Sequence, residues 1–226
     1  MKFKKQLLAL LVLVVAFGAA LGSFVLLRPE SGPGDSGYAA PPPAASDARA
    51  VRENSHRLTR PAESRVTVVE FLDFECESCG AFHPVMERLK KEYGDRVTFV
   101  ARYFPLPGHR NSHSAARAAE AAAQQGKFAE MHDMLFETQA EWGEAQEPKD
   151  AVFRGYARQL GLDLARYDAA VADPRTAERI AYDQRDGAGL KVQGTPTFFV
   201  EGTRVRPRGY EDFKLILDER LAASRA

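Results

Sequence analysis

An apolar run leads directly into the only two cysteines of the chain: Val66-Thr67-Val68-Val69-Glu70-Phe71-Leu72-Asp73-Phe74-Glu75-Cys76-Glu77-Ser78-Cys79. Residues 65–72 are β-branched and apolar, which predicts a buried strand. From residue 76 to residue 93 the apolar side chains recur at helical spacing, and Gly94 is a typical stop. Residues 96–104 form a second predicted strand. This β-α-β order predicts parallel strands joined by a right-handed crossover.

The rest of the folded part alternates helical and extended patterns. Helical patterns occupy residues 114–140, 149–160, 164–172 and 175–187. Residues 197–200 and 204–206 then predict a β-hairpin, and residues 210–223 an amphipathic helix. We therefore expect an α/β domain over residues 62–226, in which a helical insertion at about 110–190 separates a β-α-β half from a β-β-α half.

The composition is that of a soluble globular domain. The chain has 226 residues, 45% hydrophobic and 27% charged, and its formal net charge is +0. This length allows one domain plus a targeting segment and a tether. A neutral chain gives no reason to expect nucleic acid as a partner.

The N-terminus has the pattern of a membrane-targeting segment. Lys2, Lys4 and Lys5 precede residues 7–27, which contain no charge and no proline. A helix of that length is about 30 Å long, enough to cross the core of a lipid bilayer. The three lysines before this run and the mixed charges after it place residues 1–6 in the cytoplasm and the residues from about 28 onward outside. The alternative is a cleaved signal peptide, but the apolar run exceeds a typical signal core and favours an uncleaved anchor.

Residues 28–61 are predicted to be a linker. They are rich in Pro, Gly, Ala and Ser and have no apolar periodicity. His56 falls in this segment, where we expect a solvated side chain.

The two cysteines favour redox chemistry. A pair separated by two residues is no disulfide framework, and as a structural staple it would close only a very short loop. A zinc site normally needs further protein ligands, and the chain has no second Cys-x-x-Cys pair. The start of a helix stabilises a thiolate, so we expect Cys76 to be the exposed nucleophile. Cys79 lies one turn on and is expected to be the more buried resolving thiol.

Glu70 precedes the cysteines on the predicted strand, among apolar neighbours. A buried carboxyl group there would have a raised pKa and would be able to take the proton of Cys79 during exchange. The alternative is that Glu70 points outward at the edge of the strand.

Several motifs together resemble the thioredoxin-fold disulfide oxidoreductases, and within them the bacterial DsbA-like branch with a helical insertion. These motifs are Phe74-Glu75-Cys76, Phe82-His83-Pro84, Arg102-Tyr103-Phe104-Pro105-Leu106, Gly126-Lys127-Phe128 and Gly194-Thr195-Pro196-Thr197. The resemblance covers residues 66–221. It implies that Cys76 and Cys79 form a redox disulfide, that Pro196 is cis beside it, and that Thr195 offers backbone hydrogen bonds to a bound polypeptide.

The resemblance also implies where the protein acts and on what. With the N-terminal pattern, it predicts a single-pass protein of a bacterial cell membrane whose catalytic domain is extracytoplasmic; a secreted protein is the alternative. The expected partners are thiols and disulfides of secreted or periplasmic polypeptides and a membrane redox partner, for which the resemblance implies a link to quinone. No cofactor and no metal are expected.

The direction of the reaction is left open by the residues between the cysteines. Strongly oxidising members carry proline and histidine there, whereas this chain has Glu77-Ser78. Asp73 and Glu75 add negative charge, which disfavours a thiolate, so we expect a less oxidising disulfide. A Cys76 thiol that titrates as low as about pH 4 would refute this hypothesis. An oxidase is the leading interpretation, and a reductase or isomerase and a client-binding module are the alternatives.

We expect structural roles, and no metal or catalytic role, for the remaining histidines. His109 and His113 have the spacing of a zinc-binding pair, but Arg110 stands where that motif needs an acid. His83 is expected to pack locally, with tuning of Cys76 as the alternative. His132 is expected on the exposed side of its helix.

Overall fold

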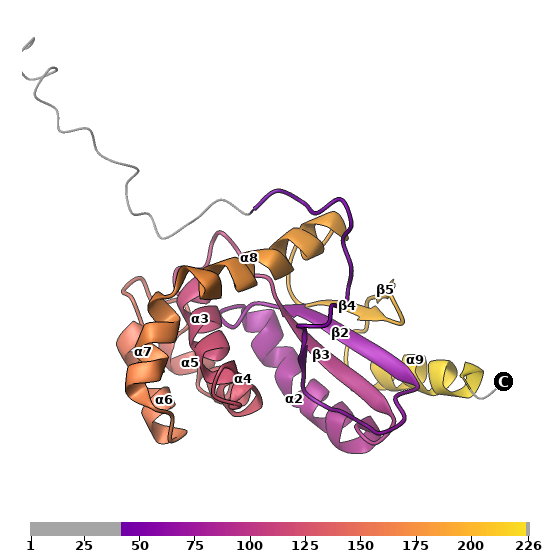
Figure 1. Cartoon of the computed structure of the whole chain (residues 1–226). Helices are drawn as coiled ribbons and strands as arrows, with labels where there is room; N and C mark the ends of the chain where they lie inside the picture. The colour runs from indigo at the N-terminus through magenta and orange to yellow at the C-terminus, as the bar shows by residue number, and fades with distance from the viewer. Residues whose placement is uncertain (1–41, 225–226) are drawn as a thin grey trace, which may run out of the picture. The chain divides into compact units, whose positions relative to one another are not determined.

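The computed structural model describes residues 42–224 (Figure 1). The predicted cytoplasmic segment 1–6, the predicted membrane anchor 7–27 and the first part of the predicted linker lie outside the described residues. Among residues 42–224, no helix combines the length and the apolar character needed to cross a membrane.

A five-stranded sheet forms the centre of the fold, with the strand order β1-β3-β2-β4-β5. The strands are β1 (His56–Arg57), β2 (Val66–Leu72), β3 (Val97–Tyr103), β4 (Thr197–Val200) and β5 (Thr203–Val205). Strands β2 and β3 pair in parallel, whereas β1 with β3, β2 with β4 and β4 with β5 are antiparallel. The predicted β-α-β unit and the predicted hairpin are therefore both confirmed.

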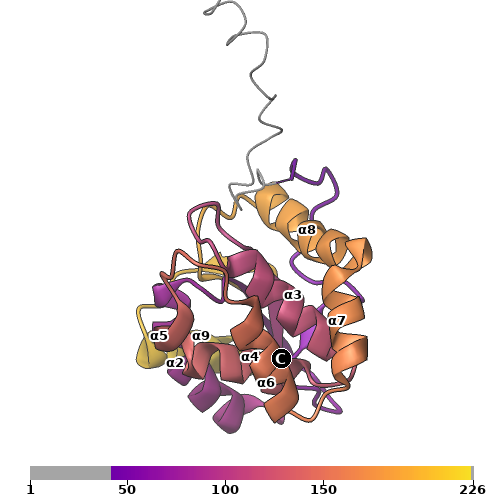
Figure 2. The same cartoon turned by 90° about the vertical axis from the view of Figure 1, so that its left-hand side faces the viewer.

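Helices cover both faces of the sheet and form a block beside it (Figure 1). The helices are α2 (Glu77–Tyr93), α3 (Ser112–Ala123), α4 (Phe128–Glu137), α5 (Gln139–Trp142), α6 (Asp150–Gln159), α7 (Leu164–Ala172), α8 (Pro174–Gly189) and α9 (Tyr210–Ala223). Helices α3, α4, α6 and α7 lie together on the side that faces the viewer in Figure 2, and α8 runs from this block across the sheet. The predicted helical insertion corresponds to this block and α8.

The side chains of β2 alternate between two cores. Val66 and Val68 pack with residues of α2 and α9 on one face of the sheet. Val69 and Phe71 pack on the opposite face, where Gly187 of α8 allows close approach to Phe71. Because neighbouring side chains of a strand point to opposite faces, Glu70 lies on the face that α2 covers.

The first part of the insertion is not the continuous helix that residues 114–140 predicted. The chain turns at Gly126, whose φ of 75° lies in the left-handed region that favours glycine. This turn separates α3 from α4, and Thr138 separates α4 from α5. The alanines of α3 are buried against the aromatic residues of the block, among them Trp142 and Phe153.

The last part of the predicted linker belongs to the fold, so the expected boundary at residue 61 is wrong. Strand β1 pairs with Val100 and Ala101 of β3, and the N–H of Ala45 donates to the carbonyl of Arg185. The expectation of a solvated His56 is also wrong. Its Nε2 lies 2.7 Å from Oε2 of Glu120, and its ring stacks on Phe128 with the ring centroids 3.9 Å apart.

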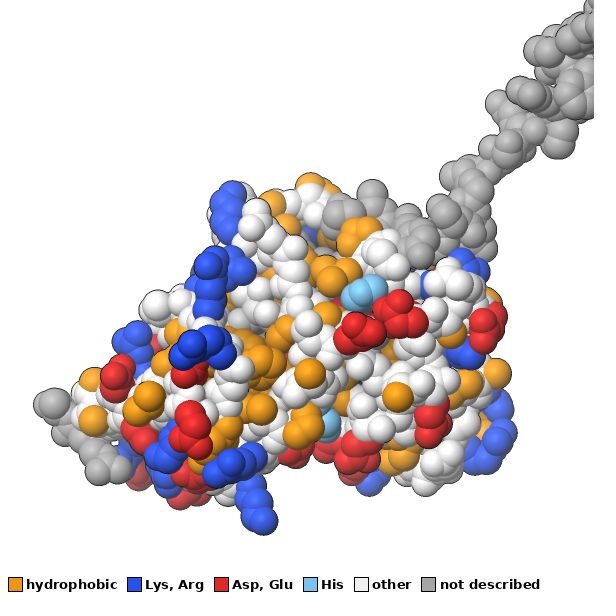
Figure 3. All heavy atoms as spheres, turned by 180° about the vertical axis from the view of Figure 1, so that it is seen from behind, with side chains coloured by type: hydrophobic (Ala, Val, Ile, Leu, Met, Phe, Trp, Pro, Cys, Tyr) orange, Lys and Arg blue, Asp and Glu red, His pale blue; other side chains and the backbone are white. Residues whose placement is uncertain are grey.

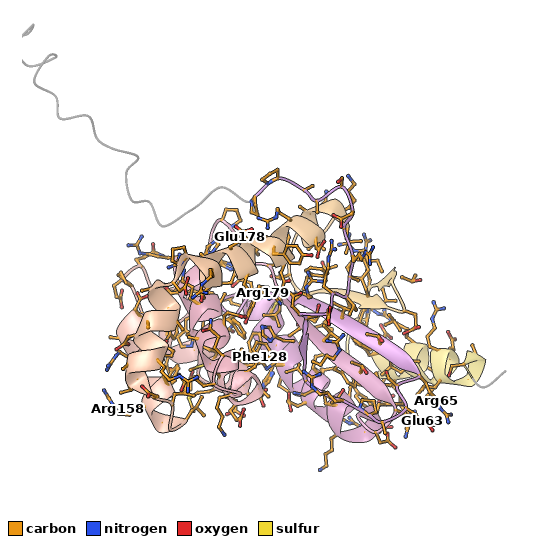
Figure 4. All side chains as sticks on the ribbon, viewed as in Figure 1. Glu63, Arg65, Phe128, Arg158, Glu178 and Arg179 are labelled. Carbon is orange, nitrogen blue, oxygen red and sulfur yellow. The ribbon has the colours of Figure 1, made fainter. Side chains whose placement is uncertain are left out.

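Buried ion pairs fasten this N-terminal segment to α8. Arg102 of β3 is 0% exposed and lies 2.7 Å from both Asp183 and Asp186. Arg52 makes a second ion pair with Asp186, also at 2.7 Å. Figure 4 shows Arg179 of α8 near the centre of the molecule, where it donates to Asp183 and to the carbonyl of Asn54. The segment that looked like a linker is therefore held by charges contributed from residues far away in the sequence.

Candidate functional site

Cys76 and Cys79 lie at the junction between the end of β2 and the start of α2. Cys76 is the N-cap residue of α2, with φ −69° and ψ 118°, and its carbonyl accepts from the N–H of Gly80 at 3.0 Å. Both cysteines are free thiols in this structure. Cys76 is 8% exposed and Cys79 is 1% exposed. Cys76, at the helix start, is the more accessible of the two and Cys79 the more buried, in the order that the sequence predicted. Both are buried, however, so the expectation of an exposed Cys76 is wrong.

The surroundings move the pKa values of the two thiols in opposite directions. Hydrogen bonds from the Cys79 thiol and from the backbone N–H groups of Cys79 and Ser78 lower the pKa of Cys76 to about 5, although burial opposes this. Burial and its hydrogen bond to Cys76 raise the pKa of Cys79 well above its usual value. At neutral pH, Cys76 is thus a thiolate and Cys79 a protonated thiol.

Glu70 is buried next to the cysteine pair, so the alternative of an outward-pointing side chain is wrong. It is 6% exposed, and burial raises its pKa to about 8, with the charge of Cys76 acting in the same direction and Lys90 opposing it. The charge of Glu70 in turn contributes to the raised pKa of Cys79. A carboxyl group with this pKa can both donate and accept a proton near neutral pH.

Thr195 and Pro196 lie against the cysteine that starts the helix. The Thr195–Pro196 peptide bond is cis, as the resemblance implied. The Cys76 sulfur lies 3.3 Å from the Thr195 carbonyl oxygen. Both residues line a groove of about 330 Å³ that also touches Ser78, between the two cysteines. The loop before β4 is therefore brought to the redox pair across 119 residues of sequence.

His109 is part of the site, a position that was not predicted from the sequence. Its Nδ1 lies 2.6 Å from Oδ2 of Asp73, and this contact raises the pKa of His109 to about 9. The charge of Cys76 acts in the same direction, so the imidazolium lies within electrostatic reach of the thiolate. The one available signal was a histidine in the loop that leaves the carboxyl end of β3, the same edge of the sheet as Cys76.

Two of the acids expected to oppose the thiolate have partners. Asp73 accepts from the backbone N–H groups of Glu75 at 2.9 Å and Leu106 at 2.8 Å, in addition to its contact with His109. Glu75 accepts from the backbone N–H of Asn111. Their negative charge is thus partly balanced. A Cys76 pKa as low as about 4 would refute the hypothesis of a less oxidising disulfide. The pKa of Cys76 is about 5, which does not refute it, so the hypothesis stays a prediction.

Gln139 of α5 holds the turn that carries Cys76, a contact that the sequence did not indicate. Its Nε2 donates to the carbonyl oxygens of Phe74 at 2.7 Å and Cys76 at 2.9 Å. Gly80 faces this side chain, and a Cβ atom at Gly80 would lie 2.2 Å from Oε1 of Gln139. The helical insertion therefore contacts the active-site turn directly.

One group of side chains has metal-ligand character. His83, His132 and Asp133 each offer one ligand atom, all within 4.8 Å of one another. His132 is 2% exposed, so its expected exposed position is wrong, whereas His83 packs locally against the Phe136 ring as expected. The ammonium group of Lys90 lies 3.8 Å from Asp133 and supplies positive charge at this position.

Comparison with known proteins places this geometry in a family. A family model described as thioredoxin matches residues 61–219. The chain belongs to this family. The matched range contains the redox pair, the helical insertion and the loop of Thr195 and Pro196.

Solved structures of oxidoreductases share the fold of this chain. A thioredoxin-like oxidoreductase from Silicibacter pomeroyi DSS-3 is 30% identical, with a TM-score of 0.64, over 77% of this chain and 95% of that one. BdbD from Bacillus subtilis is 23% identical, with a TM-score of 0.66, over 74% and 93% of the two chains. Wolbachia pipientis alpha-DsbA1 is 18% identical, with a TM-score of 0.68, over 77% and 94%. The last two likenesses concern the fold alone.

Curated relatives match over part of their own length. The Na(+)/H(+) antiporter NhaA 1 of Salinispora arenicola is 40% identical over 209 residues, which is 85% of this chain and 29% of that protein. NhaA 3 of Salinispora tropica is 47% identical over 146 residues, 64% of this chain and 21% of that protein. The chain thus spans less than a third of the length of these two relatives. Antiport is the activity that their names give to those proteins.

Proposed function

We propose that this protein is an extracytoplasmic oxidase that donates its Cys76–Cys79 disulfide to thiols of secreted polypeptides. The observation that carries this proposal is the contrast between the two sulfurs: a Cys76 thiol whose pKa is about 5 and a buried Cys79 thiol whose pKa is raised. A thiol of low pKa leaves a mixed disulfide readily, which favours passing the disulfide to a client.

The exchange begins at the more accessible sulfur. A client thiolate attacks Sγ of Cys76, a mixed disulfide forms, and the sulfur of Cys79 leaves with the bonding electron pair. A second client thiolate then attacks the client sulfur of that mixed disulfide, and Cys76 leaves as a thiolate. The client thiols lose two electrons and become a disulfide, while the protein is reduced to the dithiol.

Glu70 supplies the proton for the first step. Because Cys79 is buried and its pKa is raised, its thiolate is a poor leaving group unless it is protonated. With a pKa of about 8, Glu70 is mostly protonated at pH 7 and able to give its proton to Cys79. During reoxidation Cys76 attacks the disulfide of the oxidant, and the proton returns to Glu70 when Cys79 then attacks Sγ of Cys76 in that mixed disulfide.

Turnover requires an oxidant for the dithiol. We place the domain outside the cytoplasm, anchored in the lipid bilayer by residues 7–27, where a membrane redox partner that passes two electrons to a quinone would reoxidise it. The resemblance to the DsbA-like branch and the apolar N-terminal run support this placement.

Trapping in cells tests the proposal. Cys79→Ser removes the resolving thiol, so clients stay attached to Cys76 as mixed disulfides; Cys76→Ser is the matched control and traps none. Alkylation of free thiols reports the resting state of the wild-type protein. An oxidised wild type with trapped clients supports an oxidase. A reduced wild type supports the reductase or isomerase alternative, and an absence of trapped species supports a binding module.

A further inference from the structure

The groove beside the redox pair is apolar at its floor and basic at its rim. Its volume is about 330 Å³, and it begins next to Thr195, whose carbonyl oxygen lies 3.3 Å from the Cys76 sulfur. Phe82 and Phe198 supply aromatic surface, and Arg204 and Arg206 of the β5 region supply charge. No aspartate or glutamate lines this groove.

The two arginines have no carboxylate partner among residues 42–224. Arg204 is held in place by the carbonyl of Lys191 at 2.9 Å and the hydroxyl of Thr197 at 3.4 Å, both neutral acceptors. Arg206 is exposed and makes no hydrogen bond or ion pair with the described residues. By contrast, the next arginine, Arg208, pairs with Asp212 at 2.9 Å and lies outside the groove. An anion that enters the groove would therefore meet guanidinium groups that no carboxylate of the described residues neutralises.

The acidic residues that flank Cys76 in the sequence do not line this groove. Asp73 and Glu75 are buried and accept hydrogen bonds from other residues, and Glu77 is exposed in the first turn of α2. Figure 3 shows lysine and arginine side chains gathered beside a hydrophobic hollow, with aspartate and glutamate side chains on the far side next to a histidine.

We propose that this groove selects client segments in which an acidic residue lies beside the reactive cysteine. An extended chain advances about 3.3 Å per residue, so a neighbour of the client cysteine is within reach of the groove when that cysteine is bonded to Cys76. Its carboxylate would pair with Arg206 and Arg204, and apolar neighbours would cover Phe82 and Phe198. Arginine suits this role because its planar guanidinium donates two parallel hydrogen bonds to a carboxylate.

This inference rests on the proposed exchange with polypeptide thiols, and it is tested with peptides. Three two-cysteine peptides are identical except for Glu, Gln or Lys next to the first cysteine. The oxidised full-length protein, purified in mild detergent, is mixed with each peptide, and peptide oxidation is followed by mass spectrometry after alkylation. Each rate constant is divided by that for dithiothreitol, an uncharged dithiol, with the same protein variant.

The expected order is Glu above Gln above Lys, with the Glu and Lys peptides differing by about 3–10-fold at low salt and by less at about 0.5 M salt. Arg206→Glu reverses the order, and Arg206→Gln with Arg204→Gln removes the preference. The matched control Arg208→Gln keeps it. Equal rates with the three peptides, or a preference that survives loss of both groove arginines, overturn the inference. Oxidation of neither peptides nor dithiothreitol would instead refute the proposed function.

Discussion

Replacement of Glu70 by glutamine is expected to stabilise the protein, by an amount that depends on pH. Burial raises the pKa of Glu70 to about 8 from an ordinary value of 4.5. Between these values the unfolded chain loses a proton that the folded protein keeps, so the free energy of unfolding falls as pH rises. The slope is about 1.4 kcal/mol per pH unit, which gives about 3 kcal/mol at pH 7.

Glutamine fills the same space and never ionises, so it removes this penalty. Glu70→Gln is therefore expected to change the stability little at pH 4 and to raise it by up to about 3 kcal/mol at pH 7, less whatever the amide loses in hydrogen bonding. Urea unfolding of the reduced protein at a series of pH values measures the difference. Oxidation of Cys76 removes the thiolate that helps to raise the pKa of Glu70, so the gain should be smaller in the disulfide form.

The matched control is Glu219→Gln, an exposed carboxylate on α9, which is expected to change stability by less than about 0.5 kcal/mol at any pH. A stability difference for Glu70→Gln that stays constant from pH 4 to pH 8 would refute the assignment of a buried, proton-holding carboxyl group. If Glu70→Gln also abolishes client oxidation while it raises the stability, then Glu70 is a functional group that destabilises the folded protein.

Three further tests probe the geometry of the site and its support. Alkylation of Cys76 by iodoacetamide should reach half its maximal rate near pH 5, and Cys79→Ala should move that midpoint upward, because the largest contribution to the low pKa is the Cys79 hydrogen bond; an unmoved midpoint contradicts this. Arg102→Ala should lower the free energy of unfolding by about 3–5 kcal/mol in urea titrations, because it removes the fully buried partner of Asp183 and Asp186, which then keep only Arg179 and Arg52; a loss below about 1 kcal/mol would contradict a buried ion-pair network. Gly80→Ala should displace the Gln139 side chain, with a loss in thermal stability that is smaller when Gln139→Ala is also present; additive losses would argue against their contact.

The parts of the fold that the sequence predicted are those with local signals. The β-branched, apolar run of β2 and the helical spacing of α2 are readable from single segments, and together they placed Cys76 at the start of a helix. Glu70 was a candidate because it is a carboxyl group among apolar neighbours on that strand, shortly before the cysteines.

The parts that it missed depend on distant partners. Strand β1 has two residues, too few for a pattern, and exists because β3 offers an edge. His56 is held by Glu120 and Phe128, and His109 by Asp73, across 36 or more residues in each case. A linker composition and an isolated histidine look the same whether or not such a partner exists elsewhere in the chain.

The short strand β1 also has a consequence for solubility. It covers the outer edge of β3, which would otherwise present its N–H and C=O groups along a sheet edge of apolar residues. Unpaired edges of this kind recruit strands from other molecules and promote aggregation. The matched family range begins at residue 61, after β1. A chain shortened to that range would expose the edge of β3, whereas one that begins before residue 45 keeps it closed.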